Sequence, residues 1–217
     1  FGSATDVGLG GYAERMRIDS GGSVIIGIGG TSGTPAADYR SLEIGRQGNT
    51  ITGAPWKSNL YFSTNATITA GSTAFTYRYA SELPTKMIME DGFWTFSNAV
   101  AGTVGSTISF TERMRIDSSG SFGLGIVPKA SGTAWVNAQF GQATNIVSRK
   151  GASANAIYSN NFYIDSASAD KRIIAGESNR LFLDGATTRF QYAGTGAANS
   201  VVSWSESMRI DSSGNVG

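Results

Sequence analysis

Six acidic residues near predicted strand ends have side chains that could act on a substrate. Two carboxylates facing each other across a cleft can hydrolyse a glycosidic bond, one as an acid and the other as a base or nucleophile. Most of these acids stand at turn positions, where Asp commonly bonds its own backbone. A catalytic pair would therefore have to be assembled by the fold or between subunits. The six acids are Glu90, Asp91, Asp165, Asp170, Glu177 and Asp184.

Other catalytic chemistries are excluded by residue types that the sequence lacks. Without His there is no Ser-His-Asp triad, no His general base and no His-ligated metal. Without Cys there is no thiolate nucleophile, thiolate metal site or disulfide framework. No Asp-rich loop has the calcium-binding spacing. We expect no catalytic residue, no metal site and no cofactor in this chain, and catalysis by a pair of the acids is kept as an alternative.

Two glycine-rich strings resemble nucleotide-binding fingerprints only by letter. Gly-Leu-Gly-Gly-Tyr-Ala at residues 8–13 has the spacing, but it leads into a predicted strand and not into a helix. Gly-Ile-Gly-Gly-Thr-Ser-Gly at residues 27–33 has Ser32 where the third glycine belongs. We interpret both as chance matches in a chain with 29 glycines.

Charge and hydropathy patterning exclude two classes of partner. The 17 basic and 16 acidic residues are mixed along the chain, for a net charge of +1. No basic run exists to follow a phosphate backbone, so nucleic acid is not an expected partner. No apolar stretch approaches the roughly 18 residues of a membrane span, so no membrane insertion is expected.

A charged string that occurs three times is the strongest signal in the sequence. It reads Glu-Arg-Met-Arg-Ile-Asp at 14–19 and 112–117, and Glu-Ser-Met-Arg-Ile-Asp at 206–211. Its Arg and Asp, two positions apart, share one strand face and can pair with each other or across strands. An enzyme rarely needs several copies of the same site along one chain. We therefore interpret the motif as a scaffold that fixes the register of the strands and holds strands or chains together. Its residues are Glu14, Arg15, Met16, Arg17, Ile18, Asp19, Glu112, Arg113, Met114, Arg115, Ile116, Asp117, Glu206, Met208, Arg209, Ile210 and Asp211.

The motif marks a tandem array. Met208 follows Met114 by 94 positions, and Met114 follows Met16 by 98. Because the chain begins at Phe1 and stops inside the third copy, we expect it to be a piece of a longer polypeptide. The expected parts are 1–29, the end of a preceding unit with the first hairpin; 30–127, a second unit; and 128–217, a third unit truncated at its C-terminal hairpin.

Alternating apolar and polar residues predict an all-β protein. In the motif, Met114 and Ile116 point one way while Arg115 and Asp117 point the other. The Asp-Ser-Ser-Gly that follows is typical of a β-turn, so we predict that each motif forms the first strand of a hairpin. Glycines in the strand after the turn would allow the backbone of another strand or chain to approach closely. Further strands are predicted at 40–44, 59–63, 73–79, 87–89, 93–96, 162–165, 172–175 and 180–183; residues 134–147 are the one place where we consider a short helix.

Aromatic side chains are the candidates for contact with a partner, because exposed Trp and Tyr rings stack on sugars and anchor binding. Trp56 lies in the turn-rich Gly-Ala-Pro-Trp-Lys-Ser-Asn and is our candidate receptor-binding residue. Phe110 and Trp204 stand 94 positions apart at equivalent places, so we predict that both are core. The remaining rings on or near strands are interpreted as core or inter-chain packing: Tyr39, Tyr61, Tyr77, Tyr79, Tyr158 and Tyr163.

The string Glu-Arg-Met-Arg-Ile-Asp-Ser-Ser-Gly, with the Asn-Val-Gly that ends the third copy, resembles the repeat of bacteriophage tail-fibre proteins. The likeness is closest at 13–29, 111–125 and 205–217, and the intervening sequence matches only in its general character. The first copy departs from the family by a bulkier Val-Ile-Ile-Gly-Ile-Gly-Gly. The resemblance implies an elongated, intertwined homotrimeric fibre on the virion, outside the cell, made in the bacterial cytoplasm. Implied partners are further copies of the chain, other tail or baseplate proteins, and a host cell-surface glycan or protein.

The physical properties of the sequence agree with that implication. Apolar residues are 40% of the chain, below the usual globular share, and 29 residues are Gly, so the core per residue is thin. Winding several chains together would supply the missing burial and cover the edge strands. Two alternatives stay open: a glycan-degrading tailspike that uses the acids, and a non-viral bacterial surface stalk.

Overall fold

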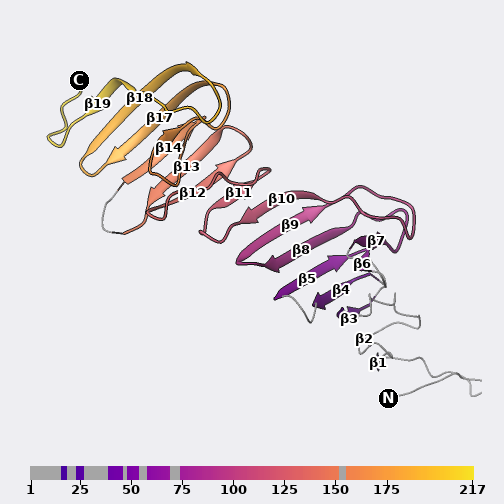
Figure 1. The fold of residues 1–217 in the computed structure, drawn as a ribbon. Coiled ribbons are helices and arrows are strands. Elements are labelled where there is room, and N and C mark those ends of the chain that lie inside the picture. The colour runs from indigo at the N-terminus through magenta and orange to yellow at the C-terminus, as the bar shows by residue number, and fades with distance from the viewer. Residues whose placement is uncertain are drawn as a thin grey trace, which may run out of the picture. The chain divides into compact units, whose positions relative to one another are not determined.

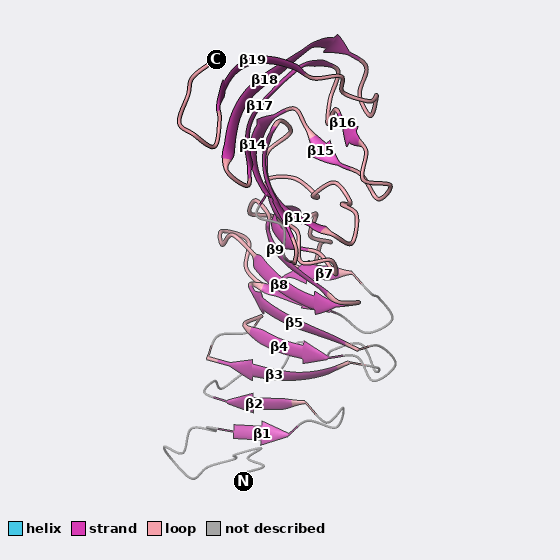
Figure 2. Cartoon of the chain, turned by 90° about the vertical axis from the view of Figure 1, so that its left-hand side faces the viewer, coloured by secondary structure: helices cyan, strands magenta, loops and turns pink. Residues whose placement is uncertain are grey.

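The computed structural model describes residues 16–18, 23–26, 39–45, 48–53, 58–68, 74–151 and 155–217. Every regular element in these segments is a β-strand, and none of them contains a helix (Figure 2). The all-β prediction is therefore confirmed for the described part of the chain.

The chain divides into two compact units, Phe1–Glu112 and Arg113–Gly217. The strand that carries the second motif, β10 (Thr111–Ile116), straddles this division. The division differs in position from the limits at 29/30 and 127/128 that the sequence repeat suggests. We call the two parts unit 1 and unit 2 and describe each by itself.

Unit 1 is a sheet whose strands follow one another almost in chain order (Figure 1). Neighbouring strands pair antiparallel except for β2 and β3, which pair parallel. A separate two-stranded ribbon of β6 and β7 is inserted between β5 and β8. The strands are β1 (Met16–Ile18), β2 (Val24–Ile26), β3 (Arg40–Ile44), β4 (Thr50–Gly53), β5 (Asn59–Thr64), β6 (Ala66–Ile68), β7 (Phe75–Tyr77), β8 (Thr85–Glu90) and β9 (Phe93–Asn98).

Unit 2 uses the same order of pairings. A hairpin of β10 and β11 is followed by a parallel step to β12 and then by an antiparallel meander. The ribbon of β15 and β16 is inserted between β14 and β17 and lies to one side of the curved strands (Figure 2). The strands are β11 (Phe122–Leu124), β12 (Trp135–Phe140), β13 (Thr144–Arg149), β14 (Asn155–Asn160), β15 (Tyr163–Ile164), β16 (Asp170–Lys171), β17 (Gly176–Asp184), β18 (Thr187–Gly196) and β19 (Ser205–Ile210).

Loop hydrogen bonds recur between the units at the sequence offset. The amide of Ser106 donates to the carbonyl of Thr103 over 3.0 Å, and the amide of Ser200 donates to the carbonyl of Ala197 over 3.2 Å. Both residues of the second pair follow those of the first by 94 positions. The loops that precede β10 and β19 are therefore built alike.

Each unit buries a small apolar cluster between its sheet and its inserted ribbon. Phe110 packs against the first cluster and Trp204 against the second, which confirms that both are core. Phe75 meets Phe110 edge to face at 5.8 Å, and Phe162 meets Trp204 at 5.4 Å. The buried residues are Tyr39, Tyr61, Ala66, Ile68, Phe75, Tyr77 and Ile108 in unit 1, and Val147, Ile157, Phe162, Ile164, Ala193 and Val202 in unit 2.

Two predicted elements are wrong. Residues 134–147 hold strands β12 and β13, joined by a turn in which Gly141 has φ 58°, and no helix. Residues 172–175 form no strand, because Arg172 turns inward and its guanidinium donates to the carbonyls of Gly176, Gly194 and Val201. A buried cation that bonds three backbone carbonyls holds this segment in an irregular path.

Candidate functional site

The second copy of the repeated motif ends in an Asp-capped turn. β10 carries residues 112–116, and the Oδ1 of Asp117 accepts from the amides of Ser119 and Ser121, both at 2.9 Å. Gly120 has φ 85°, a left-handed conformation that side chains resist. The turn predicted from Asp-Ser-Ser-Gly is confirmed.

The third copy repeats this turn. β19 carries residues 206–210, and the Oδ1 of Asp211 accepts from the amides of Ser213 and Asn215 at 2.8 and 2.9 Å. Gly214 has φ 86°. Hydrogen bonds from the Asn215 side chain and from the turn backbone lower the pKa of Asp211. The motif Asp therefore caps the turn that follows it.

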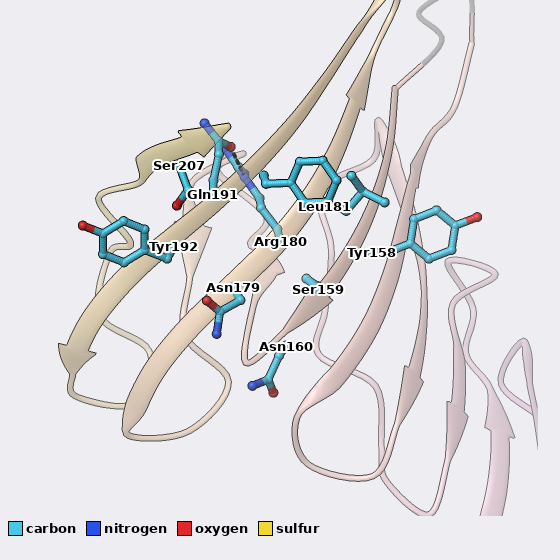
Figure 3. Close-up of a pocket in the computed structure, with 10 residues that line it drawn as sticks. Tyr158, Ser159, Asn160, Asn179, Arg180, Leu181, Gln191, Tyr192 and Ser207 are labelled. Atoms are coloured by element: carbon cyan, nitrogen blue, oxygen red, sulfur yellow. Dashed lines mark hydrogen bonds between the residues drawn. The ribbon is translucent and has the colours of Figure 1, made fainter. Parts of the chain in front are cut away.

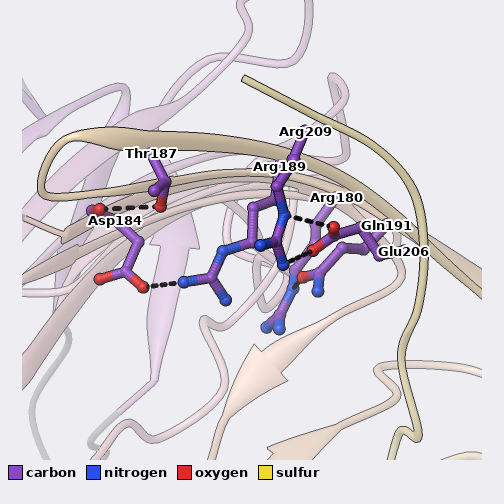
Figure 4. A network of polar contacts seen from close by, with 7 residues as sticks. All are labelled: Arg180, Asp184, Thr187, Arg189, Gln191, Glu206 and Arg209. Carbon is purple, nitrogen blue, oxygen red and sulfur yellow. Dashed lines mark hydrogen bonds and ion pairs between the residues drawn. The ribbon is translucent and has the colours of Figure 1, made fainter. Parts of the chain in front are cut away.

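The motif Arg in the third copy pairs within its strand. The Nε of Arg209 lies 2.7 Å from the Oε1 of Glu206, and the second guanidinium nitrogen lies 3.2 Å from the other oxygen (Figure 4). This hydrogen bond lowers the pKa of Glu206 and raises the pKa of Arg209. Arg209 thus takes Glu206 as its partner, and Asp211 serves the turn.

Part of the predicted set falls outside the described residues. Met16, Arg17 and Ile18 form β1. Outside the described residues lie Glu14, Arg15, Asp19 and the candidate contact Trp56.

Two of the six acids considered for glycan hydrolysis, Asp165 and Asp170, are engaged in structural contacts. One oxygen of Asp170 accepts from Arg180 at 2.8 Å and from the indole of Trp204 at 2.7 Å. Asp165 caps a turn like those of the motif, with the amides of Ala167 and Ala169 both 2.9 Å from its Oδ1.

Two further acids occupy the ends of strands. Asp184 forms an ion pair with Arg189 at the end of β17 (Figure 4). Asp91 lies in the turn between β8 and β9 with φ 47°, and Gly92 follows with φ 79°. Two successive left-handed residues in a two-residue loop are typical of a type I′ hairpin turn.

A buried cation stands at the centre of the unit 2 core. The Arg180 side chain is 8% exposed, and its guanidinium lies 4.2 Å from the Trp204 ring centroid and 4.8 Å from that of Phe182. Burial lowers the pKa of Arg180, and the charge of Asp170 opposes this change. The second hydrogen-bond partner, Gln191, accepts from the Nε at 2.7 Å (Figure 4). Asp170 and Gln191 thus hold the Arg180 guanidinium against the core rings.

The opposite face of the unit 2 sheet is open. Ile157, Phe182 and Ala193 pack in the core, so their neighbours along each strand point away from it. Two cross-strand rows result on the outward face. The first joins Tyr158, Leu181 and Phe190, and the second joins Asn160, Asn179 and Tyr192.

A shallow groove of about 340 Å³ lies along these two rows. Tyr158 and Tyr192 stand on its two sides, with the amides of Asn160 and Asn179 between them (Figure 3). The two tyrosines are 49% and 51% exposed, which is far more than a core ring shows. We call this feature the aromatic groove; it is lined by Tyr158, Ser159, Asn160, Asn179, Arg180, Leu181, Phe190, Gln191, Tyr192 and Ser207.

The equivalent positions of unit 1 have a different chemistry. There the polar row joins Thr64, Thr85 and Asn98. The hydroxyls of Thr64 and Thr85 bond each other at 2.8 Å, so they satisfy one another. The two units share their strand pairings but differ in this row, which makes the aromatic groove the candidate functional site.

Comparisons with protein-family models, with curated proteins and with solved structures found no match to this chain. No group of three or more side chains able to hold a metal ion occurs among the described residues. The described segments also contain no helix with the length and apolar character that a membrane crossing requires.

Sequence reasoning did not single out the groove. Tyr158 is among the rings predicted to be core or inter-chain packing, and no prediction covers Tyr192, Asn160 or Asn179. A signal was present, because Tyr158 and Asn160 share one strand face, as Phe190 and Tyr192 do. What the sequence lacks is the register that brings β14, β17 and β18 together.

Proposed function

We propose that this chain is a structural and adhesive segment of a bacteriophage tail fibre that acts in host-surface attachment without catalysis. The repeated motif, its Asp-capped turns and the matching order of pairings in the two units support a repeating scaffold. The structural contacts of Asp165, Asp170 and Asp184 favour an adhesive role over that of a depolymerase.

The observation that carries the proposal is a pair of apolar cross-strand rows on the outward face of unit 1, beside the polar row of Thr64, Thr85 and Asn98. Tyr61 and Ile88 belong to or pack on the core, so their strand neighbours point outward. One row joins Leu42, Ile51, Phe62, Met87 and Phe96 across β3, β4, β5, β8 and β9, and a second joins Leu60, Met89 and Trp94. We call these eight residues the apolar face.

An apolar face of this kind favours a partner that is equally apolar. Trp94 is 48% exposed, and none of the eight residues of the apolar face carries a charge. A second and third copy of the chain bring the same surface, so self-association would remove these side chains from water. The apolar face supports self-association, and we propose that the assembly is an elongated, intertwined homotrimer whose further partners are tail or baseplate proteins.

Labelling of phage particles tests the proposal. An antibody raised against this chain is expected to decorate tail appendages in electron micrographs and to block adsorption to the host. Label on the bacterial surface would instead favour a non-viral stalk. Release of reducing sugar from host polysaccharide by the purified chain would favour the tailspike alternative.

A further inference from the structure

We infer that the aromatic groove of unit 2 is a binding site for an uncharged saccharide chain. The inference rests on the proposed adhesive function and gives it a place and a ligand class. The ligand is identified by three properties of the groove: its rings, its amides and its lack of available charge.

The rings suit the flat apolar faces of sugars. Tyr158 lies on β14 and Tyr192 on β18, two strands away, so their Cα atoms are at least about 10 Å apart across the sheet. Tyrosine offers a large rigid contact area with a polar tip, and such rings are typical anchors of binding. Two rings at this separation provide stacking positions for two different sugar units of one chain.

The amides between the rings suit hydroxyl groups. Asn160 and Asn179 are exposed cross-strand neighbours, and within the described residues neither side chain makes a hydrogen bond. Each amide offers two donor hydrogens and one acceptor oxygen, which matches a sugar hydroxyl that both donates and accepts. In the corresponding row of unit 1, Thr64 and Thr85 bond each other instead.

The charge of the groove selects a neutral ligand. Arg180 is the one charged residue in the lining, and its guanidinium is held on the core side by Asp170 and Gln191. No free cation is therefore offered to an acidic sugar by the lining residues. The groove is open along the sheet, so an extended chain fits it better than a compact molecule.

The test uses the full chain on an array of neutral oligosaccharides of four to six hexoses and their uronic-acid counterparts. Wild-type protein is expected to bind a neutral member. The variants Tyr158→Ala and Tyr192→Ala are each expected to weaken that binding by about tenfold or more, because each removes one stacking anchor. Tyr192→Phe keeps the ring and is expected to keep most of the affinity.

A matched pair of variants places the binding in unit 2. Asn179→Ala is expected to weaken saccharide binding, whereas Thr85→Ala, at the equivalent position 94 residues earlier, is expected to leave it unchanged. The inference is overturned if no neutral oligosaccharide binds, if acidic members bind in preference, or if the tyrosine variants bind like wild type. Particles that still carry the chain and adsorb through it would then leave the proposed function standing.

Discussion

The guanidinium of Arg180 lies 4.2 Å from the centroid of the Trp204 ring, and 94 residues earlier the ammonium of Lys86 lies 4.4 Å from the centroid of the Phe110 ring. In each unit a cation therefore packs over an aromatic ring of the core. The ring belongs to the segment that directly precedes the next copy of the motif. Such a contact combines the burial of a ring with electrostatic attraction to its face. The two units therefore share this cation–ring contact as well as the order of their strands.

Replacing Arg180 by Met is expected to destabilise the protein by about 3 kcal/mol, because Asp170 would remain part-buried without its cation. Denaturant unfolding at fixed protein concentration measures this change. The control is Arg209→Met, which removes an exposed ion pair and is expected to cause no measurable loss. Equal effects of the two variants would contradict a structural role for the buried pair.

Lys86 predicts a pH dependence of stability. Burial lowers the pKa of Lys86 below its ordinary 10.5, an effect that Glu90 and Glu112 partly offset. The unfolded chain therefore binds more protons than the folded chain between the lowered pKa and 10.5, and stability rises with pH in that window. Wild type is expected to gain stability relative to Lys86→Met as the pH rises toward 10.5. A constant difference between the two proteins across this range would contradict the assignment.

Replacing Asp117 by Ala is expected to cost about 1–2 kcal/mol, because the amides of Ser119 and Ser121 lose their shared acceptor. Asp117→Asn keeps one acceptor oxygen and is expected to cost less. Ser118→Ala, in the same turn, is the control and should behave as wild type. Thermal unfolding followed by circular dichroism measures all three, and an equal loss in Asp117→Ala and Ser118→Ala would exclude the capping role.

The apolar face of unit 1 predicts how the assembly is broken. Met87→Glu places a charge in the middle of the longer row and is expected to dissociate the oligomer, because a buried unpaired charge is strongly unfavourable. Val104→Glu is the control, since Val104 is 57% exposed in a loop outside both rows. Light scattering after size-exclusion chromatography compares the masses. Dissociation by both variants, or by neither, would place the contact elsewhere.

The sequence predicted the elements whose signal is local. Alternation predicted β3 without error, and Asp with Gly predicted the turn after Asp117. The offset between repeats placed Phe110 and Trp204 in the core. Each of these depends on residues close in the chain or on internal repetition.

What the sequence did not predict depends on burial and register that no short segment encodes. The β12–β13 hairpin was missed because its inward residues are partly polar: Asn137, Gln139 and Asn145 are at most 3% exposed, so hydrophobic alternation is hidden. The aromatic groove was missed because Tyr158 and Tyr192 meet only through the pairings of β14, β17 and β18.

The mass of the intact chain in solution tests the central claim most directly. Sedimentation equilibrium at micromolar concentration is expected to give three times the 22.7 kDa of one chain. It should also show no dissociation on dilution through that range, because an interface formed by the apolar face would remove large side chains from water. A single species of 22.7 kDa at all concentrations would contradict the account of this protein as a trimeric fibre segment.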